Sequence, residues 1–208
     1  MKGEESMKKK NELDVVFLLD RSGSMGGIEE DTIGGYNSYI KEQKDKDIKI
    51  TTVLFDDKYE MINNREDIKN IELLTKKTYY VRGSTALLDA IGKTINYMDK
   101  VKNKVLFIIT TDGLENSSKE FTKEQIKEMI QGHKNFEFMY IGANIDSYSE
   151  GSSIGISKDN IANYEQSKKG VNKLFKSLSK ASTCMYEGEC LGTSWKKELE
   201  DYIETNKK

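Results

Sequence analysis

The side chains best suited to chemistry in this sequence follow a short apolar run near its start. Val15 to Leu19 are all apolar, which is typical of a strand buried on both faces of a parallel sheet. Asp20, Ser22 and Ser24 come directly after it, on a tight loop from which their oxygens can converge on one point. Small, hard oxygen ligands suit a cation such as Mg²⁺. The alternative is a simple turn in which Asp20 caps the next helix.

A second carboxylate follows a second apolar run. Val105 to Ile109 are wholly apolar and lead into Thr110, Thr111, Asp112 and Gly113. In the commonest doubly wound sheet, with strand order 3-2-1-4-5-6, ligands bind at the carboxyl ends of strands 1 and 4, where the order reverses. Asp20 and Asp112 would flank that crevice together, which favours a metal site over a simple turn.

A third loop, Arg82 to Asp89, could complete the set of ligands. Thr85 is placed to open a helix, where its hydroxyl either caps backbone N–H groups or points at a cation. Gly83 allows the backbone to approach the site closely. Two carboxylates would balance the double charge of the ion, while neutral hydroxyls would leave it able to accept one more oxygen. An Asp or Glu of a partner protein could supply that oxygen in place of a water.

These three segments resemble the loops of a metal-ion-dependent adhesion site, which belongs to the von Willebrand factor type A (VWA) domain family. The matching stretches are Asp20-Arg21-Ser22-Gly23-Ser24, Gly83-Ser84-Thr85 and Thr110-Thr111-Asp112-Gly113. Thr85 to Ala90 is also similar to the Thr-x-Leu-x-Asp-Ala stretch of many bacterial members. The resemblance runs from Phe17 to about Lys180 and implies a doubly wound fold that binds Mg²⁺, Mn²⁺ or Ca²⁺.

The same resemblance implies a role for each residue of the site. Ser22 and Ser24 would bind the metal directly, Thr85 directly or through water, and Asp20 and Asp112 mostly through water. Further residues are expected to support the site or touch its ligand: Arg21, Gly23, Gly83, Asp89 and Gly113. Arg21 could grip an acidic ligand or face water. Asp89, one turn after Thr85, could hydrogen-bond the metal loop or lie on a solvated helix face.

Alternating strand and helix patterns predict an α/β fold to position these loops. We expect a doubly wound, mostly parallel six-stranded sheet with one antiparallel edge strand and helices on both faces. The predicted strands are 15–19, 48–55, 58–63 (the antiparallel edge), 105–109, 136–141 and 160–164, and 65–74 is expected to be a loop with a short helical turn. The predicted helices are 28–44, 85–101, 122–131, 147–155, 170–181 and 195–203. This divides the chain into a polar lead (1–12), a VWA domain (13–182) and a C-terminal helical extension (183–208).

Composition narrows the classes of function. The chain has 33 Lys and Arg against 35 Asp and Glu, a net charge of −2, which does not suggest nucleic-acid binding. No apolar run reaches the ~18 residues of a membrane span. Residues 1–11 lack the apolar segment of a signal peptide, so we expect a cytoplasmic protein. Cys184 and Cys190 do not have the spacing of a metal site.

The sequence favours binding over catalysis. A haloacid-dehalogenase-like phosphatase needs a second Asp where Ser22 stands. A nucleophilic Ser24 would need a glycine in place of Ser22. The single histidine, His133, falls at the end of a predicted helix.

We therefore expect a metal-dependent module, not an enzyme, that captures an acidic side chain of a partner protein. The chain looks more like intracellular bacterial and phage-borne VWA members than like animal adhesion proteins. For such members the partner could be an ATPase or an assembly component. The alternatives are a metal-dependent hydrolase that activates water and a structural assembly factor with a vestigial site.

Overall fold

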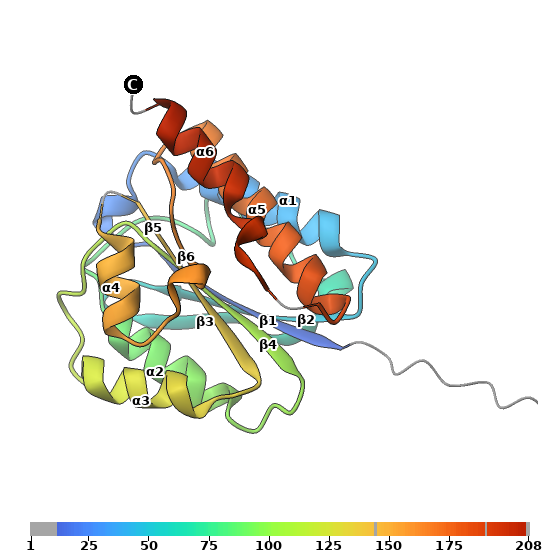
Figure 1. Ribbon diagram of the computed structural model, residues 1–208. Helices are drawn as coiled ribbons and strands as arrows, with labels where there is room; N and C mark the ends of the chain where they lie inside the picture. The colour runs from blue at the N-terminus through green and yellow to red at the C-terminus, as the bar shows by residue number, and fades with distance from the viewer. Residues whose placement is uncertain (1–11, 144, 190, 207–208) are drawn as a thin grey trace, which may run out of the picture.

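A six-stranded sheet in the order β3-β2-β1-β4-β5-β6 forms the centre of the computed structural model, which describes residues 12–143, 145–189 and 191–206 (Figure 1). β2 and β3 pair antiparallel at one edge, and every other neighbouring pair is parallel. The strands are β1 Leu13–Asp20, β2 Ile48–Phe55, β3 Tyr59–Asp67, β4 Lys104–Thr111, β5 Phe136–Gly142 and β6 Ile161–Asn163. The predicted fold class and strand order are confirmed.

Helices cover both faces of the sheet, as expected. α1, α5 and α6 lie on one face, and α2, α3 and α4 lie on the other (Figure 1). The helices are α1 Glu29–Gln43, α2 Leu87–Met98, α3 Lys123–Gly132, α4 Ser147–Ser153, α5 Lys168–Tyr186 and α6 Lys197–Asn206. Short 3₁₀ turns are Gly23–Met25, Ile68–Asn70, Lys158–Asn160 and Thr193–Trp195. None of the helices among the described residues combines the length and apolar character needed to cross a membrane.

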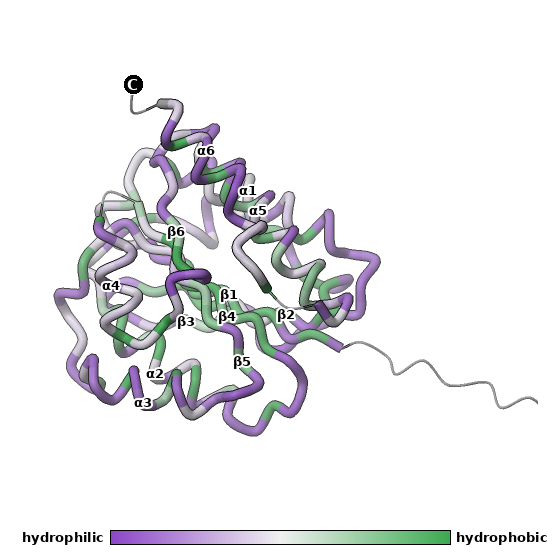
Figure 2. The backbone as a smooth tube through the Cα atoms, in the orientation of Figure 1, coloured by the Kyte–Doolittle hydropathy of each residue, from purple (hydrophilic) through white to green (hydrophobic). Residues whose placement is uncertain are grey.

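The central strand β1 is buried along its whole length, and its side chains alternate between two cores. Phe17 points to the α1 and α5 side, where its ring lies edge-on to Tyr36 and Tyr39, with centroids 5.3 and 4.8 Å away. Val16 and Leu18 point to the α2 and α3 side. Figure 2 shows the central strands β1 and β4 as largely hydrophobic. A slip of one residue would exchange the two faces, so packing fixes the register of β1 and hence the position of its last residue.

Strand β3 is longer than predicted. It continues to Asp67, through a segment that we expected to be a loop. Arg65 is held by tertiary contacts: its Nε donates to the buried Asp14 carboxylate (2.7 Å) and its backbone N–H to Thr51 Oγ1 (3.1 Å). The pairing with β2 shifts between Ile50 and Val53, and Arg65 has a φ of 44°. Because long-range contacts keep this polar segment extended, its local pattern did not reveal it.

The C-terminal part packs against the same core as the rest of the chain. α5 continues without a break across the predicted boundary between residue 182 of the domain and residue 183 of the extension. Trp195 and Leu199 beyond it are 2 % and 0 % exposed. Lys196 is also buried, and its Nζ donates to the backbone oxygens of Lys158 (2.9 Å) and Ile161 (2.7 Å) beside β6. Residues 1–11 of the polar lead, and Cys190, lie outside the described residues.

Candidate metal centre

The first and third predicted loops meet at the carboxyl ends of β1 and β4. These strands pair in parallel with Leu19 opposite Thr110, so the loops that follow them leave the sheet side by side. Ser24 Oγ donates to Asp112 Oδ1 at 2.6 Å, across 88 residues of sequence. Ser22 Oγ lies 3.1 Å from Ser24 Oγ. The structure therefore brings the two serines and Asp112 into one polar cluster.

Thr85 joins this cluster from the second loop, opposite Gly113. A Cβ added to Gly113 would lie 2.9 Å from Thr85 Oγ1, 3.1 Å from Ser24 Oγ and 3.8 Å from Ser22 Oγ. Three hydroxyl oxygens from two separate loops thus surround a single point beside the third loop. Glycine at 113 leaves this point clear of side-chain atoms.

Close backbone contacts hold the three loops together. The Gly23 N–H donates to Gly83 O at 3.2 Å, which ties the first loop to the second. Gly83 has a φ of +67°, and a Cβ there would lie 2.3 Å from Asp57 Oδ1, so only glycine fits comfortably. The Thr85 N–H donates to Asn116 Oδ1 at 2.9 Å, and the Asn116 N–H donates back to Thr85 O at 3.1 Å. The second and third loops are therefore clamped at the threonine.

Asp20 lies beneath the cluster and is fully buried. One carboxylate oxygen accepts from the Ser22 N–H at 2.7 Å and the other from the Thr111 hydroxyl at 2.6 Å. Tyr79 donates its hydroxyl to the Asp20 backbone oxygen at 2.6 Å. Burial raises the pKa of Asp20 to about 6, although the hydrogen bonds from Thr111 and Ser22 oppose the rise.

Asp112 is 6 % exposed, and burial raises its pKa as well. Its Oδ1 accepts from Ser24, and its Oδ2 accepts from Gln166 Nε2 at 2.9 Å. Gln166 also donates to Ser24 O at 3.0 Å, so it bridges two loops of the cluster. Within the described part of the chain, neither Asp20 nor Asp112 forms an ion pair with a lysine, arginine or histidine. Both carboxylates are held by neutral donors.

This donor set fits a hard divalent cation. A hydroxyl that donates its hydrogen to a carboxylate still has lone pairs for a metal ion, and Ser24 is held in that way. The described residues contain no cluster of three or more His, Cys, Asp or Glu, so the candidate site combines hydroxyls with two carboxylates. Such oxygen ligands suit Mg²⁺, Mn²⁺ or Ca²⁺ and not a metal that prefers sulfur.

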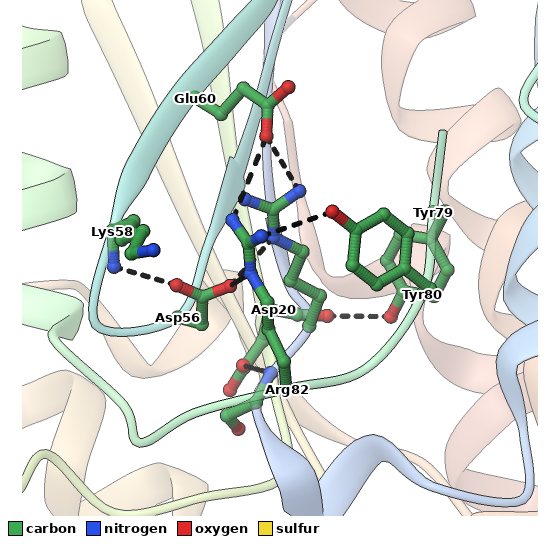
Figure 3. A network of polar contacts seen from close by, with 9 residues as sticks. Asp20, Asp56, Lys58, Glu60, Tyr79, Tyr80 and Arg82 are labelled. Atoms are coloured by element: carbon green, nitrogen blue, oxygen red, sulfur yellow. Dashed lines mark hydrogen bonds and ion pairs between the residues drawn. The ribbon is translucent and has the colours of Figure 1, made fainter. Parts of the chain in front are cut away.

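Arg21 does not face water, contrary to one of our two expectations, and it does not point into the oxygen cluster. Its side chain is fully buried and pairs with two acidic residues of the β2–β3 hairpin, Asp56 and Glu60, which Figure 3 shows close to Arg82. Its Nε donates to Asp56 Oδ2 at 2.8 Å, and Nη1 lies 2.8 Å from Glu60 Oε2. Arg82 Nε donates to the same Asp56 oxygen at 2.6 Å. Burial alone would raise the pKa of Asp56, but Arg82, the Lys58 N–H and the charge of Arg21 together hold it below its ordinary value.

Asp89 also differs from both of our expectations. It is 8 % exposed, so it does not lie on a solvated helix face, and its carboxylate does not bond the metal loop. It accepts instead from the backbone N–H groups of Lys119 (2.9 Å), Glu120 (2.9 Å) and Phe121 (3.0 Å). Asp89 thus fixes the end of the long segment between β4 and α3, whose beginning carries Asp112.

Sequence reasoning missed four side chains that support the cluster: Thr111, Gln166, Tyr79 and Asn116. Thr111 stood within the recognised motif, and its position before Asp112 was the available signal. Tyr79 is buried, and its hydroxyl donates to the backbone oxygen of Asp20. Gln166 had no local signal, because it reaches Asp112 from the segment after β6.

Solved structures share this fold. The minor pilin PilB from Streptococcus sanguinis matches with a TM-score of 0.66 and 12 % identity, over 85 % of this chain and 62 % of the pilin. The vWF domain of the type V pili tip protein Mfa5 from Porphyromonas gingivalis matches with 0.64 and 10 %, over 86 % and 97 %. The ArnB paralog VWA2 from Sulfolobus acidocaldarius matches with 0.59 and 22 %, over 83 % and 45 %.

These likenesses show that the chain has the fold of a von Willebrand factor type A domain. The chain spans less than two thirds of the length of PilB and of VWA2. Neither the models of protein families nor the curated proteins gave a match to the sequence.

Proposed function

We propose that this protein is a protein-binding module that depends on a divalent cation, with Mg²⁺ as the expected ion and Mn²⁺ or Ca²⁺ as alternatives. The observation that carries the proposal is the convergence of Ser22, Ser24 and Thr85 on the point beside Gly113. The buried carboxylates of Asp20 and Asp112 accept hydrogen bonds from the same loops and are held by neutral donors. The partner supplies the carboxylate of an Asp or Glu side chain.

The residues of the chain would share the work of binding. Ser22, Ser24 and Thr85 would offer hydroxyl oxygens, while Asp20 and Asp112 would offer negative charge and orient the serines. When bound, the ion supplies positive charge and a coordination position that an incoming carboxylate can take. Because the hydroxyls are neutral, the two Asp charges only balance the charge of the ion. The occupied site therefore has no net negative charge that would repel a third carboxylate.

The position of the single histidine of the sequence, far from the oxygen cluster, favours binding over hydrolysis. His133 lies just before β5, at the opposite end of the sheet from the cluster. Its Nδ1 is 2.6 Å from Met129 O and its Nε2 is 3.3 Å from Asp99 Oδ1. A screen with phosphate and ester substrates tests the hydrolase alternative, since turnover that is lost in Asp112→Ala would favour an enzyme.

The partner we propose is a component of a bacterial or phage assembly, or an ATPase that acts with one. The names of two structures with this fold, a minor pilin and a pili tip protein, support an assembly role. A cytoplasmic location stays a prediction from the sequence, and cell fractionation tests it.

Calorimetric titration with Mg²⁺ tests the proposal directly. We expect Asp112→Ala to keep the fold, as judged by circular dichroism, and to lose at least about tenfold in Mg²⁺ affinity, since each 1.4 kcal/mol of lost interaction is a factor of ten. The matched control is Asp45→Ala, which removes an exposed carboxylate between α1 and β2, at the far end of the sheet. Equal Mg²⁺ affinity in both variants would contradict the proposal. Pull-down of a partner with and without a chelator then tests the dependence of binding on metal.

A further inference from the structure

Helix α5 has an unusual charge composition. Between Lys168 and Tyr186 it contains five lysines and no Asp or Glu. Lys169, Lys173, Lys176 and Lys180 recur at spacings of four, three and four residues, which places them on one face of the helix. This row of lysines, here called the lysine stripe, extends over about 16 Å at 1.5 Å per residue.

The stripe borders a groove between α5 and α6. Lys169 and Lys173 lie with their Nζ atoms 5.0 and 5.3 Å from the centre of the Tyr202 ring, and Lys180 forms an ion pair with Glu198. These contacts show that α6 runs antiparallel to α5 (Figure 1). A groove of about 510 Å³ is lined by Lys168, Lys169, Asn172, Lys173, Lys176 and Glu198. In the described part of the chain, Lys180 is the one lysine of the stripe that has an ion-pair partner.

The stripe begins next to the candidate metal centre. Gln166, which donates to Asp112, stands two residues before α5. Ser167 caps the helix by accepting from the Gly170 N–H at 3.1 Å. The positive end of the helix dipole therefore adds to the charges of Lys168 and Lys169 near the site. A segment of a partner protein that places one carboxylate at the metal centre could therefore continue along α5 over a positively charged surface.

From this continuity we propose that the lysine stripe is a docking surface for an acidic segment of the partner protein. The inference rests on the proposed function and names the class of partner: an extended segment with several Asp or Glu residues. Lysines three and four apart on a helix lie ~5–6 Å from one another. Alternate side chains of an extended strand face the same way at ~6.6 Å intervals. The two spacings match well enough for successive carboxylates to meet successive lysines.

The charges across the groove favour an acidic peptide over nucleic acid. Glu198 and Asp201 of α6 line the grooves that Lys169 and Lys173 border. Duplex DNA presents one negative charge per ~1.7 Å, and these carboxylates would repel such a dense polyanion. A peptide with carboxylates several ångströms apart can face the lysines and keep its neutral residues toward α6.

Fluorescence anisotropy with a labelled peptide of about ten residues, alternating Asp and Ser, tests the inference. Fully extended, such a peptide spans about 33 Å, enough to reach from the metal centre along the stripe. At low salt with Mg²⁺, we expect the triple variant Lys169→Gln, Lys173→Gln, Lys176→Gln to weaken binding about tenfold, because each exposed pair contributes up to ~1 kcal/mol. The matched control Lys100→Gln, Lys102→Gln, Lys104→Gln removes the same charge from exposed positions near the start of β4, at the opposite end of the sheet. Its affinity should change less than about twofold, since no proposed pair is lost.

The outcomes separate this inference from the function on which it rests. Equal weakening in both triple variants would overturn the inference, because it would show attraction to net charge alone. A single-stranded oligonucleotide that displaces the peptide at a lower concentration would overturn it in favour of nucleic acid. If a chelator abolishes binding but the stripe variant behaves like its control, the inference fails and the function stands. If the stripe variant loses binding but a chelator and Asp112→Ala have no effect, the docking surface stands and the metal function fails.

Discussion

Two buried carboxylates lie at the ends of neighbouring strands in this protein, and they differ in their partners and in the direction of their pKa shifts. Asp20 ends β1 and Asp56 follows the neighbouring β2, and both are 0 % exposed. Asp56 receives two guanidinium groups, from Arg21 and Arg82, and its pKa is held below the ordinary value despite its burial. Among the described residues Asp20 receives neutral donors, the Ser22 N–H and the Thr111 hydroxyl, and burial raises its pKa to about 6.

The difference indicates that, in the part of the chain that the structure describes, Asp20 has no arginine partner because the nearest arginine side chain pairs with other carboxylates. Arg21 is the residue directly after Asp20, yet its side chain pairs with Asp56 and Glu60. The chain can therefore neutralise a buried carboxylate at this end of the sheet, and it does so one strand away from the oxygen cluster. An external divalent cation would do for Asp20 and Asp112 what the two arginines do for Asp56.

The largest expected loss of stability comes from removing one of the two arginines that neutralise Asp56. Arg21→Ala should lower the free energy of unfolding by about 3–5 kcal/mol, because it leaves the buried Asp56 with one cation where it had two. Urea denaturation of the metal-free protein measures the change. Lys123→Gln, which breaks a more exposed ion pair with Glu150, is the control and should cost less than about 1 kcal/mol. Equal effects of the two substitutions would show that the buried network adds nothing special.

For Asp20 we expect a change in the free energy of unfolding of the opposite sign. Asp20→Asn removes a buried charge and should stabilise the metal-free protein at pH 7.5 by about 1–3 kcal/mol, following 1.36 kcal/mol per pKa unit. The same substitution should abolish Mg²⁺ binding, because it removes one of the two balancing charges. Urea denaturation and calorimetric titration measure the two effects on one sample. A destabilised variant with unchanged Mg²⁺ affinity would refute this account of Asp20.

The raised pKa of Asp20 also predicts the direction of a pH dependence. Because its folded pKa of about 6 exceeds the ordinary value of 3.8, the folded metal-free protein binds a proton that the unfolded chain has released between these values. The contribution of Asp20 to stability is therefore fully present below pH ~4 and lost as the pH rises through about 6. Mg²⁺ affinity should change the other way and weaken as the pH falls through about 6. Asp20→Asn should remove the Asp20 part of the stability profile, and an unchanged profile would count against the assignment.

A smaller effect on Mg²⁺ affinity is expected from adding a methyl group at Gly113, between the three hydroxyls. Gly113→Ala places a methyl group 2.9 Å from Thr85 Oγ1 and 3.1 Å from Ser24 Oγ, which is closer than normal contact. Overpacking costs ~1–3 kcal/mol, so Mg²⁺ affinity should fall about tenfold while the fold persists. Gly34→Ala, at an exposed position of α1 with no atom within 4 Å of the added methyl group, is the control. Calorimetry that finds the same Mg²⁺ affinity in both variants would show that the hydroxyls do not face a bound ion.

The sequence predicted the sheet and the three loops because their signals are local. Apolar runs at Val15 to Leu19 and Val105 to Ile109 mark buried parallel strands wherever they occur. In a doubly wound sheet the topology then places Asp20 and Asp112 together without further information. The spacing of small oxygen-bearing residues around Gly23, Gly83 and Gly113 completed the candidate site.

The directions of side chains were beyond the sequence, because distant partners decide them. Arg21 turns away from the cluster since Asp56 and Glu60, at least 35 residues later, attract it. Asp89 bonds a backbone segment 30 to 32 residues away, and Gln166 reaches Asp112 over 54 residues. Periodicity along one segment contains no information about such pairs.

The buried Lys196 helps to protect an edge of the sheet against aggregation. The side of β6 that faces away from β5 is a sheet edge, and an edge with free backbone groups is a template on which foreign strands add. The ammonium group that bonds Ile161 O occupies one of these groups, while Trp195 anchors the segment that carries it. Loss of this C-terminal segment would open the sheet to strand addition, so aggregation and not simple unfolding is the expected fate of a truncated chain.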